Sequence, residues 1–464
     1  MIFWSLVVCA SFAVAENRQN ANPKLDRQFQ SAVAQYNAGQ FAEAAAQLED
    51  LLPRVPNNFE VQELLGLVYA SMSQDAKAIE HLEAAVRLKP NSAAARTNLA
   101  ASLSRSGDAQ RAGEQFRKAL ELEPRDFSAN HNLGEFYVQS GKIEAARPLL
   151  QQAQRINPSS YDNSYDLAMA DFLTGRLGEA RQLAQSMVLR KNTGELHNLL
   201  AQIEEKDGKF VAAANEFETA AHMDPSDDNL FDWGSELLLH RTYEPAIEVF
   251  RQATRRYPNS PRLLIGLGMA LYSRGIYEDA VTALLAAADL DPADPRCYLF
   301  LSKAYDSSPN QAQEVIQRFQ RYAELQPNNA LAQYYYAMSL WKGKRVEGSG
   351  LDIQAVESLL KKSITLDGAL PEAHVQLGNL YADQHEYGKS IPEYVRALEL
   401  NPNLPDAHYR LGTDYVHIGQ KDRAQSEFEV YQKLRAQHLA EVDKERAEVQ
   451  QFVYGAKAVP ATKP

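Results

Sequence analysis

The chain has 464 residues, of which 45% are hydrophobic and 23% are charged, so it has the composition of a folded protein and the length of several domains or a repeat array. The formal net charge is −12. This charge argues against a nucleic-acid-binding protein and against a protein that binds anionic lipid through a basic patch, because both need clustered Lys and Arg. We therefore expect neither nucleic acid nor a lipid surface as a direct partner.

The first predicted element, residues 1–15, is apolar and uncharged. It ends in Ala13-Val14-Ala15, the small-x-small pattern of a signal-peptidase site. Residues 1–15 are therefore predicted to be a signal peptide, and 16–22 a short linker. Because no Lys or Arg precedes the apolar run, either the true start lies upstream or the signal is weak. We expect an exported protein, periplasmic or in the cell envelope; a cytoplasmic protein is the alternative, and a retained N-terminal anchor comes third.

The next element is a long array in which proline recurs every 33 to 35 residues. The series is Pro56, Pro90, Pro124, Pro158, Pro225, Pro258, Pro292 and Pro327. Asn192 and Asp367-Gly368 fill slots where the series has no proline, and Pro402 follows the second of these. Proline and glycine both end helices, and a period of this length is typical of a helical solenoid.

Small residues recur at fixed distances before each proline. Examples are Gly66 and Gly134 at 24 residues, Ala78 and Ala146 at 12 residues. Small side chains at fixed points let two antiparallel helices approach closely. In residue type and spacing the pattern resembles the tetratricopeptide repeat, with typical units such as Asn132-LGEFYVQSGKIEAARPLLQQAQRINP. The resemblance implies an all-α fold, an α-α superhelix of about twelve helix-turn-helix units over residues 23–436.

Three units depart from the pattern. The fifth has Asp171 and Ala184 where large apolar residues usually pack, and the ninth has a turn at Ser307-Ser308-Pro309-Asn310. The tenth carries an insertion beginning at Gly343, which we place between its two helices. These departures concern local packing only.

The last predicted elements close the array. One long helix is expected over 421–449, within which residues 437–455 form the C-terminal capping extension, and 456–464 are expected to be a disordered tail. Such a cap shields the apolar face that the last hairpin cannot bury on another repeat.

No pattern of catalytic or metal-binding residues emerges. The ten histidines have no metal-ligand spacing, and His385-Glu386 lacks the second histidine of a zinc-binding helix. Carboxylates are abundant, but helix pairs with acidic solvent faces produce paired carboxylates by chance. Because the repeats leave no stretch for a catalytic domain, we expect no enzyme activity, no cofactor and no metal.

The candidate site is a groove. In the family that the chain resembles, the first helix of each hairpin lines a concave groove that holds peptides or domains. Counting back from each proline places an apolar set at these positions: Tyr165, Met169, Phe172, Phe231, Ile265, Met269, Tyr272, Leu299, Tyr334, Met338 and Trp341. An exposed apolar run marks a binding surface. The alternative is that these side chains pack inside the superhelix, since the register can slip by one position.

The resulting prediction is a non-catalytic protein-protein interaction scaffold that binds a protein or peptide partner in the groove. One alternative is a structural subunit of an envelope export or assembly apparatus, for example for polysaccharide. Another is an accessory subunit of a separate transferase, and a cytosolic regulator remains if the N-terminus is not a signal. Membrane association is expected only indirectly, through a partner or an uncleaved N-terminus.

Overall fold

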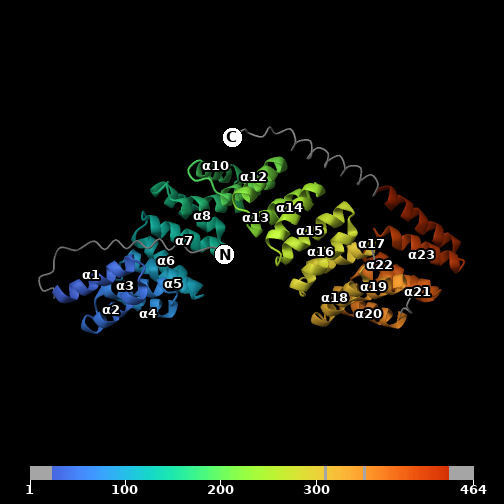
Figure 1. Ribbon diagram of the computed structural model, residues 1–464, viewed down its shortest axis with the longest axis horizontal. Coiled ribbons are helices and arrows are strands. Elements are labelled where there is room, and N and C mark those ends of the chain that lie inside the picture. The colour runs from blue at the N-terminus through green and yellow to red at the C-terminus, as the bar shows by residue number, and fades with distance from the viewer. Residues whose placement is uncertain (1–22, 308–310, 348–351, 438–464) are drawn as a thin grey trace. The chain divides into compact units, whose positions relative to one another are not determined.

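The computed structural model of the chain describes residues 23–307, 311–347 and 352–437, and within them every regular element is a helix (Figure 1). The predicted all-α solenoid is therefore confirmed. The predicted signal peptide, the linker, and the capping extension and tail from residue 438 onward lie outside the described residues. In the described part of the chain, no helix is both long enough and apolar enough to cross a bilayer.

The chain divides into two compact units, one ending at Asn192 and one beginning at Thr193, which we call unit 1 and unit 2. The division falls where the proline series is interrupted. The helices of unit 1 are α1 (Pro23–Asn37), α2 (Phe41–Leu51), the short 3-10 helix η1 (Leu52–Arg54), α3 (Phe59–Ser71), α4 (Asp75–Leu88), α5 (Ala93–Arg105), α6 (Ala109–Leu122), α7 (Phe127–Gln139), α8 (Ile143–Ile156), α9 (Tyr161–Leu173) and α10 (Leu177–Val188).

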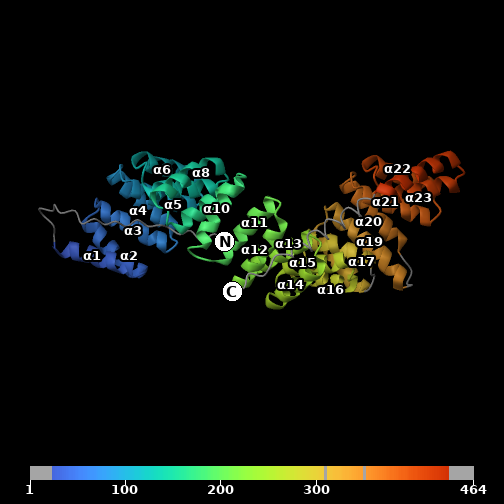
Figure 2. The same ribbon diagram turned by 90° about the horizontal axis from the view of Figure 1, so that it is seen from above.

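Unit 2 continues the same pattern of paired helices, visible from a second side in Figure 2. Its helices are α11 (Gly194–Lys206), α12 (Phe210–Met223), α13 (Asp227–Leu239), α14 (Tyr243–Arg256), α15 (Pro261–Arg274), α16 (Tyr277–Leu290), α17 (Pro295–Ser307), α18 (Ala312–Leu325), α19 (Ala330–Glu347), α20 (Ile353–Leu366), α21 (Pro371–Asp383), α22 (Tyr387–Leu400) and α23 (Pro405–His417). Residues 421–437 are helical as well.

Many of the first helices begin with a side-chain cap that follows the proline slot, although α21 and α23 have none. Two residues after Pro90, the Ser92 hydroxyl accepts a hydrogen bond from the Ala95 amide, and Asp126 caps α7 in the same way after Pro124. A side chain that accepts from an N-terminal amide replaces a hydrogen bond the helix cannot make. The repeated prolines therefore end one hairpin. At Pro90 and Pro124, the polar residue two positions later begins the next hairpin.

Close approach of the two helices in a hairpin depends on the small residues. A methyl group on Gly134 of α7 would lie 2.8 Å from Leu150 Cγ on α8, and one on Gly234 of α13 would lie 2.7 Å from Phe250 Cζ on α14. Leu150 and Phe250 are fully buried. The small residues therefore let the two helices approach closely, as predicted, because a large side chain of the second helix occupies the space beside each glycine.

First helices of successive hairpins also pack on one another within each unit. In unit 1, α3 packs on α5, α5 on α7, and α7 on α9; in unit 2, α13 packs on α15, α15 on α17, and α17 on α19. Elements that approach most closely along a curved stack lie on its inner side. Among the second helices, α16 and α18 also contact each other, but contacts of this kind link the first helices of more hairpins. This agrees with the inner position that the resemblance implies for the first helices.

Two of the irregular repeats have clear physical explanations. Asp171 of α9 is buried where an apolar residue was expected, and it forms an ion pair with Arg147 of α8. The insertion of the tenth repeat was predicted to lie between the two helices. In the structure it starts inside the first of them, because α19 continues through Gly343 to Glu347. A methyl group on Gly343 would lie 2.7 Å from Ile316 Cδ1 of α18 and 3.0 Å from the Tyr305 hydroxyl of α17, so Gly343 packs closely against both helices.

Candidate functional site

The predicted groove residues fall into three groups by exposure. Ile265, Met338 and Trp341 are buried, at 5 to 6% exposure, and Leu299 is exposed at 38%. The half-buried group comprises Tyr165, Met169, Phe172, Phe231, Met269, Tyr272 and Tyr334. Tyr165, Met169 and Phe172 belong to α9 in unit 1, whereas the other four lie on α13, α15 and α19 in unit 2.

The buried group packs inside unit 2. Met338 and Trp341 of α19 share a hydrophobic cluster with Leu360 of α20 and Tyr381 of α21. Ile265 belongs to the large cluster that contains Phe250. These three side chains therefore pack inside the solenoid, which is the alternative that the sequence left open.

The half-buried side chains of unit 2 combine apolar contact with partial exposure. Phe231 meets Phe250 edge-on at 6.2 Å between ring centroids, and the Arg262 guanidinium lies 5.2 Å from the Phe231 centroid. Tyr272 contacts Tyr277 at 5.7 Å.

Phe300 of α17 was not selected from the sequence, although it follows Leu299 directly. It is half-buried against the same core, with Lys303 Nζ 5.6 Å from its ring. Moving the assumed register of the repeat by one residue along α17 would have selected Phe300 in place of Leu299. We define the apolar strip of unit 2 as Phe231, Met269, Tyr272, Phe300 and Tyr334, all packed against one hydrophobic core.

The first helices of unit 1 carry half-buried carboxylates in addition to the apolar side chains of α9. Burial raises the pKa of Glu63 to about 7, with Lys89 opposing the shift and Glu60 adding to it. Burial also raises the pKa values of Glu135 and Asp166 to about 7, and the negative charge of Asp162 adds to both shifts. We define the carboxylate row of unit 1 as Glu63, Glu135 and Asp166.

Unit 2 contains a cavity of about 320 Å³ between α11, α12 and α13. We call it the acidic pocket; its lining residues are Gln202, Glu205, Phe217, Asp232, Ser235, Glu236 and Leu239. The Glu236 side chain is only 2% exposed, and burial followed by repulsion from Glu205 raises its pKa to about 7. The expectation that carboxylates lie on solvent faces is wrong for Glu236. The spacing of Asp232 and Glu236, one helical turn apart, was the only signal in the sequence.

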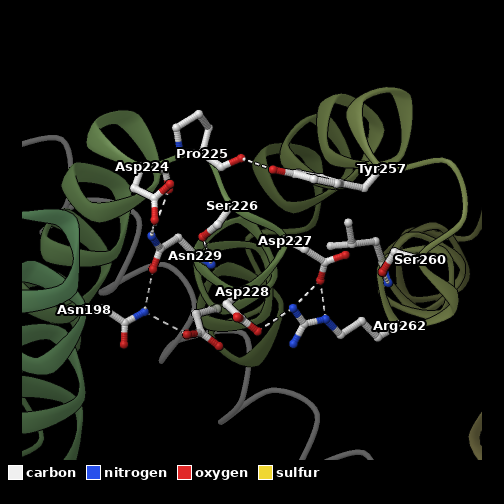
Figure 3. Close-up of polar contacts among 12 residues, drawn as sticks. Asn198, Asp224, Pro225, Ser226, Asp227, Asp228, Asn229, Tyr257, Ser260 and Arg262 are labelled. Atoms are coloured by element: carbon white, nitrogen blue, oxygen red, sulfur yellow. Dashed lines mark hydrogen bonds and ion pairs between the residues drawn. The ribbon is translucent and has the colours of Figure 1, made fainter. Parts of the chain in front are cut away.

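A larger depression, of about 640 Å³, lies over the loops at the ends of α14 and α16 and includes Arg262 and Arg296. Two of the three arginines that line it are already paired with carboxylates. Arg262 forms ion pairs with Asp227 and Asp228, as Figure 3 shows, and Arg296 pairs with Asp294 at 2.7 Å.

A polar ladder connects the first helices at this end of unit 2. The Asn198 amide of α11 donates to Asn229 of α13 at 3.1 Å (Figure 3). It also donates to the Asp232 carboxylate at 2.8 Å. Arg262 continues the ladder from α13 to α15 through its two aspartates. These bonds fix α11, α13 and α15 side by side and hold Asp232 at the rim of the acidic pocket.

In the described residues, no group of three His, Cys, Asp or Glu side chains is arranged to hold a metal ion. The arrangement offers two kinds of recognition in unit 2, apolar contact along the strip and carboxylate contact in the pocket.

Comparison with known proteins identifies the repeat. A family model described as Tetratricopeptide repeat matches residues 29–93, 72–129 and 231–295, and a second with the same description matches 103–158 and 137–203. A model described as TPR repeat matches residues 378–416. The TPR repeat-containing protein YpiA of Bacillus subtilis (strain 168) is 25% identical over 189 residues, which are 40% of this chain and 42% of that protein. The chain thus spans less than half the length of this relative.

Solved structures show weaker similarity. A tetratricopeptide repeat protein from Parabacteroides merdae ATCC 43184 is 16% identical with a TM-score of 0.42, covering 53% of this chain and 98% of that one. PilW, a type IV pilus biogenesis factor, is 23% identical with a TM-score of 0.41, covering 45% and 97%. The APC/C hetero-tetramer Cut9-Hcn1 contains a chain that is 14% identical with a TM-score of 0.40, covering 93% and 96%. Similarities of this size say nothing about function.

Proposed function

Because the chain belongs to the tetratricopeptide repeat family, we propose that it is a non-catalytic scaffold that binds a protein or peptide partner along the apolar strip of unit 2. The observation that carries the proposal is the strip itself. Its five side chains sit on first helices, pack on one core and remain partly exposed. Clustered aromatic and methionine side chains on a rigid face supply the buried contact area on which protein interfaces depend.

The proposal includes an exported protein, periplasmic or in the cell envelope. Its support is the apolar run that ends in Ala13-Val14-Ala15. Any association with a membrane is then indirect, through the partner or an uncleaved N-terminus.

The test is partner capture from detergent-solubilised envelope, using the chain from Glu16 onward. A Met269→Ala, Tyr272→Ala variant removes exposed apolar contact from α15 without touching the buried Trp341. A matched control, Leu290→Ala with Leu325→Ala, removes exposed apolar side chains from the ends of second helices. All three proteins are first compared by circular dichroism, so that only folded variants enter the capture step.

We expect the wild type and the control to retain the same partner, identified by mass spectrometry, and the strip variant to retain at least about tenfold less, since hot-spot residues each cost about 1 to 2 kcal/mol or more. Equal retention by all three proteins would place the binding face elsewhere. Retention of a whole membrane complex would favour a structural subunit of an envelope apparatus.

A further inference from the structure

We propose, building on the scaffold function, that the acidic pocket of unit 2 receives a lysine or arginine side chain of the partner protein. The pocket has the right form for such a side chain. It has a volume of about 320 Å³, Phe217 and Leu239 supply apolar walls, and Glu205, Asp232 and Glu236 supply three carboxylates. Lysine and arginine place an aliphatic stem on apolar surface while their charged heads stay in a polar environment.

The charge of the pocket is compensated only in part, by the Arg262 guanidinium, which acts on Asp232 without forming an ion pair with it. In the described part of the chain, no Lys or Arg forms an ion pair with any of the three carboxylates. Asp232 accepts a hydrogen bond from the neutral Asn198 amide. Glu236 Oε1 lies 3.3 Å from His240 Nε2 yet accepts no hydrogen bond from a described residue.

An incoming cation would remove this imbalance. Burial raises the pKa of Glu236 and lowers that of His240, so the neighbouring imidazole supplies no positive charge to Glu236 near neutral pH. The Arg262 charge acts on Asp232 and not on Glu236. A buried carboxylate without a cation is costly, and a charge-assisted hydrogen bond to a guanidinium or ammonium group offsets that cost. Glu236 supplies the least hydrated acceptor, while Glu205 and Asp232 attract the cation at the rim.

The pocket also lies in line with the apolar strip. Ser235, at the pocket, precedes Met269 of the strip by one repeat, and both follow the small glycine of their helix directly. Phe231 of the strip and Asp232 of the pocket are neighbours on α13. A partner lying along the strip therefore reaches the pocket at the α11–α13 end, which predicts a recognition segment with a basic residue beside apolar ones.

The test uses the full chain and a fluorescein-labelled peptide of alternating arginine and glycine, read by anisotropy at about 150 mM salt to suppress non-specific attraction. A peptide with citrulline in place of arginine keeps the shape and loses the charge; a lysine version covers the other cation. The pocket variant is Glu205→Gln with Asp232→Asn and Glu236→Gln. The control variant, Glu248→Gln with Glu314→Gln and Glu399→Gln, changes the net charge equally on the exposed faces of α14, α18 and α22.

We expect the arginine or lysine peptide to bind the wild type and the control within about twofold of each other and the pocket variant at least about tenfold more weakly, with the citrulline peptide weak throughout. Equal weakening in both variants would show attraction by net charge alone and overturn the proposal. Equal binding of arginine and citrulline peptides would overturn it too. If the triple variant unfolds, Glu205→Gln alone must still weaken binding more than Glu248→Gln alone.

Failure here is distinguishable from failure of the scaffold function. A partner captured through the strip, with no effect of the pocket variant on any peptide, removes only the pocket proposal. A cationic peptide bound by the pocket, with no partner dependent on the strip, removes the strip as the partner-binding face.

Discussion

Units 1 and 2 are built from the same helix hairpin but present different chemistry on their first helices. In unit 1 the carboxylate row is half-buried, and Glu135 and Asp166 are each shifted by burial and by the nearby Asp162. In unit 2 the first helices carry the apolar strip, and Glu236 is buried in the acidic pocket, while Glu204 and Asp414 are buried outside it. The hairpin therefore fixes the spacing of the face, while a few positions in each repeat decide what the face can bind.

The largest expected effect tests whether the two units are energetically separate. Phe250→Ala removes the ring that fills the space beside Gly234 and Gly266, and should cost unit 2 about 3 to 5 kcal/mol. Repeat units transmit stability mainly to their neighbours, so unit 1 should be unaffected. In a chain starting at Glu16, tryptophan fluorescence reports only unit 2, through Trp233 and Trp341.

In the Phe250→Ala variant, the midpoint of urea unfolding followed by this fluorescence should shift to a lower urea concentration. The rates of hydrogen exchange in α3 to α7 should stay as in the wild type. Leu290→Ala, at an exposed helix end, serves as the control. An equal loss of protection in both units would mean that they unfold as one.

The next effect sharpens the electrostatic side of the comparison. Asp166 has a pKa of about 7 in the folded protein, against about 3.9 in an unfolded chain. The folded state thus binds this proton more tightly, so its stabilising contribution is complete below about pH 4 and is lost as the pH rises through 7. Unit 1 should be less stable at pH 8 than at pH 5, and Asp166→Asn should remove about 1 to 2 kcal/mol of that difference, a value discounted because a quarter of the side chain is exposed.

Hydrogen exchange of α7 and α9 at the two pH values measures this change, with the exposed Glu121→Gln as control. Glu135 titrates together with Asp166, so some pH dependence should remain. A pH profile identical in wild type and Asp166→Asn would contradict the prediction.

The smallest effect concerns a feature that both units share, the turn inside each hairpin. Ser73 occupies a left-handed conformation with φ 58°, where Gly107 stands in the next repeat with φ 89°. Ser73→Gly should stabilise unit 1 by about 0.5 kcal/mol, and Gly107→Ser should destabilise it by about 1 kcal/mol, because only glycine adopts this conformation without steric cost. Thermal unfolding measures both; the same sign for the two substitutions would show that the turns do not limit stability.

The sequence predicts the fold correctly at positions where a residue type has a single structural role. Proline slots, the caps behind them and the glycines facing Leu150 or Phe250 predict the hairpins, because each acts within its own repeat. Trp341 shows the limit: its burial depends on contacts with later helices in a repeat lengthened by an insertion. The pocket around Glu236 was missed because burial of a carboxylate depends on how three helices meet, which no spacing within α13 reveals.

The stacking of neighbours has a consequence for how the chain acquires its structure. In the described residues, the helices that contact each other extensively are at most two elements apart. Contacts of such short sequence separation close small loops, which is the condition for rapid folding from many starting points. Each hairpin can therefore find its native neighbour soon after the chain emerges, without waiting for a distant segment, and a polypeptide threaded end-first through a narrow channel could fold progressively on the far side.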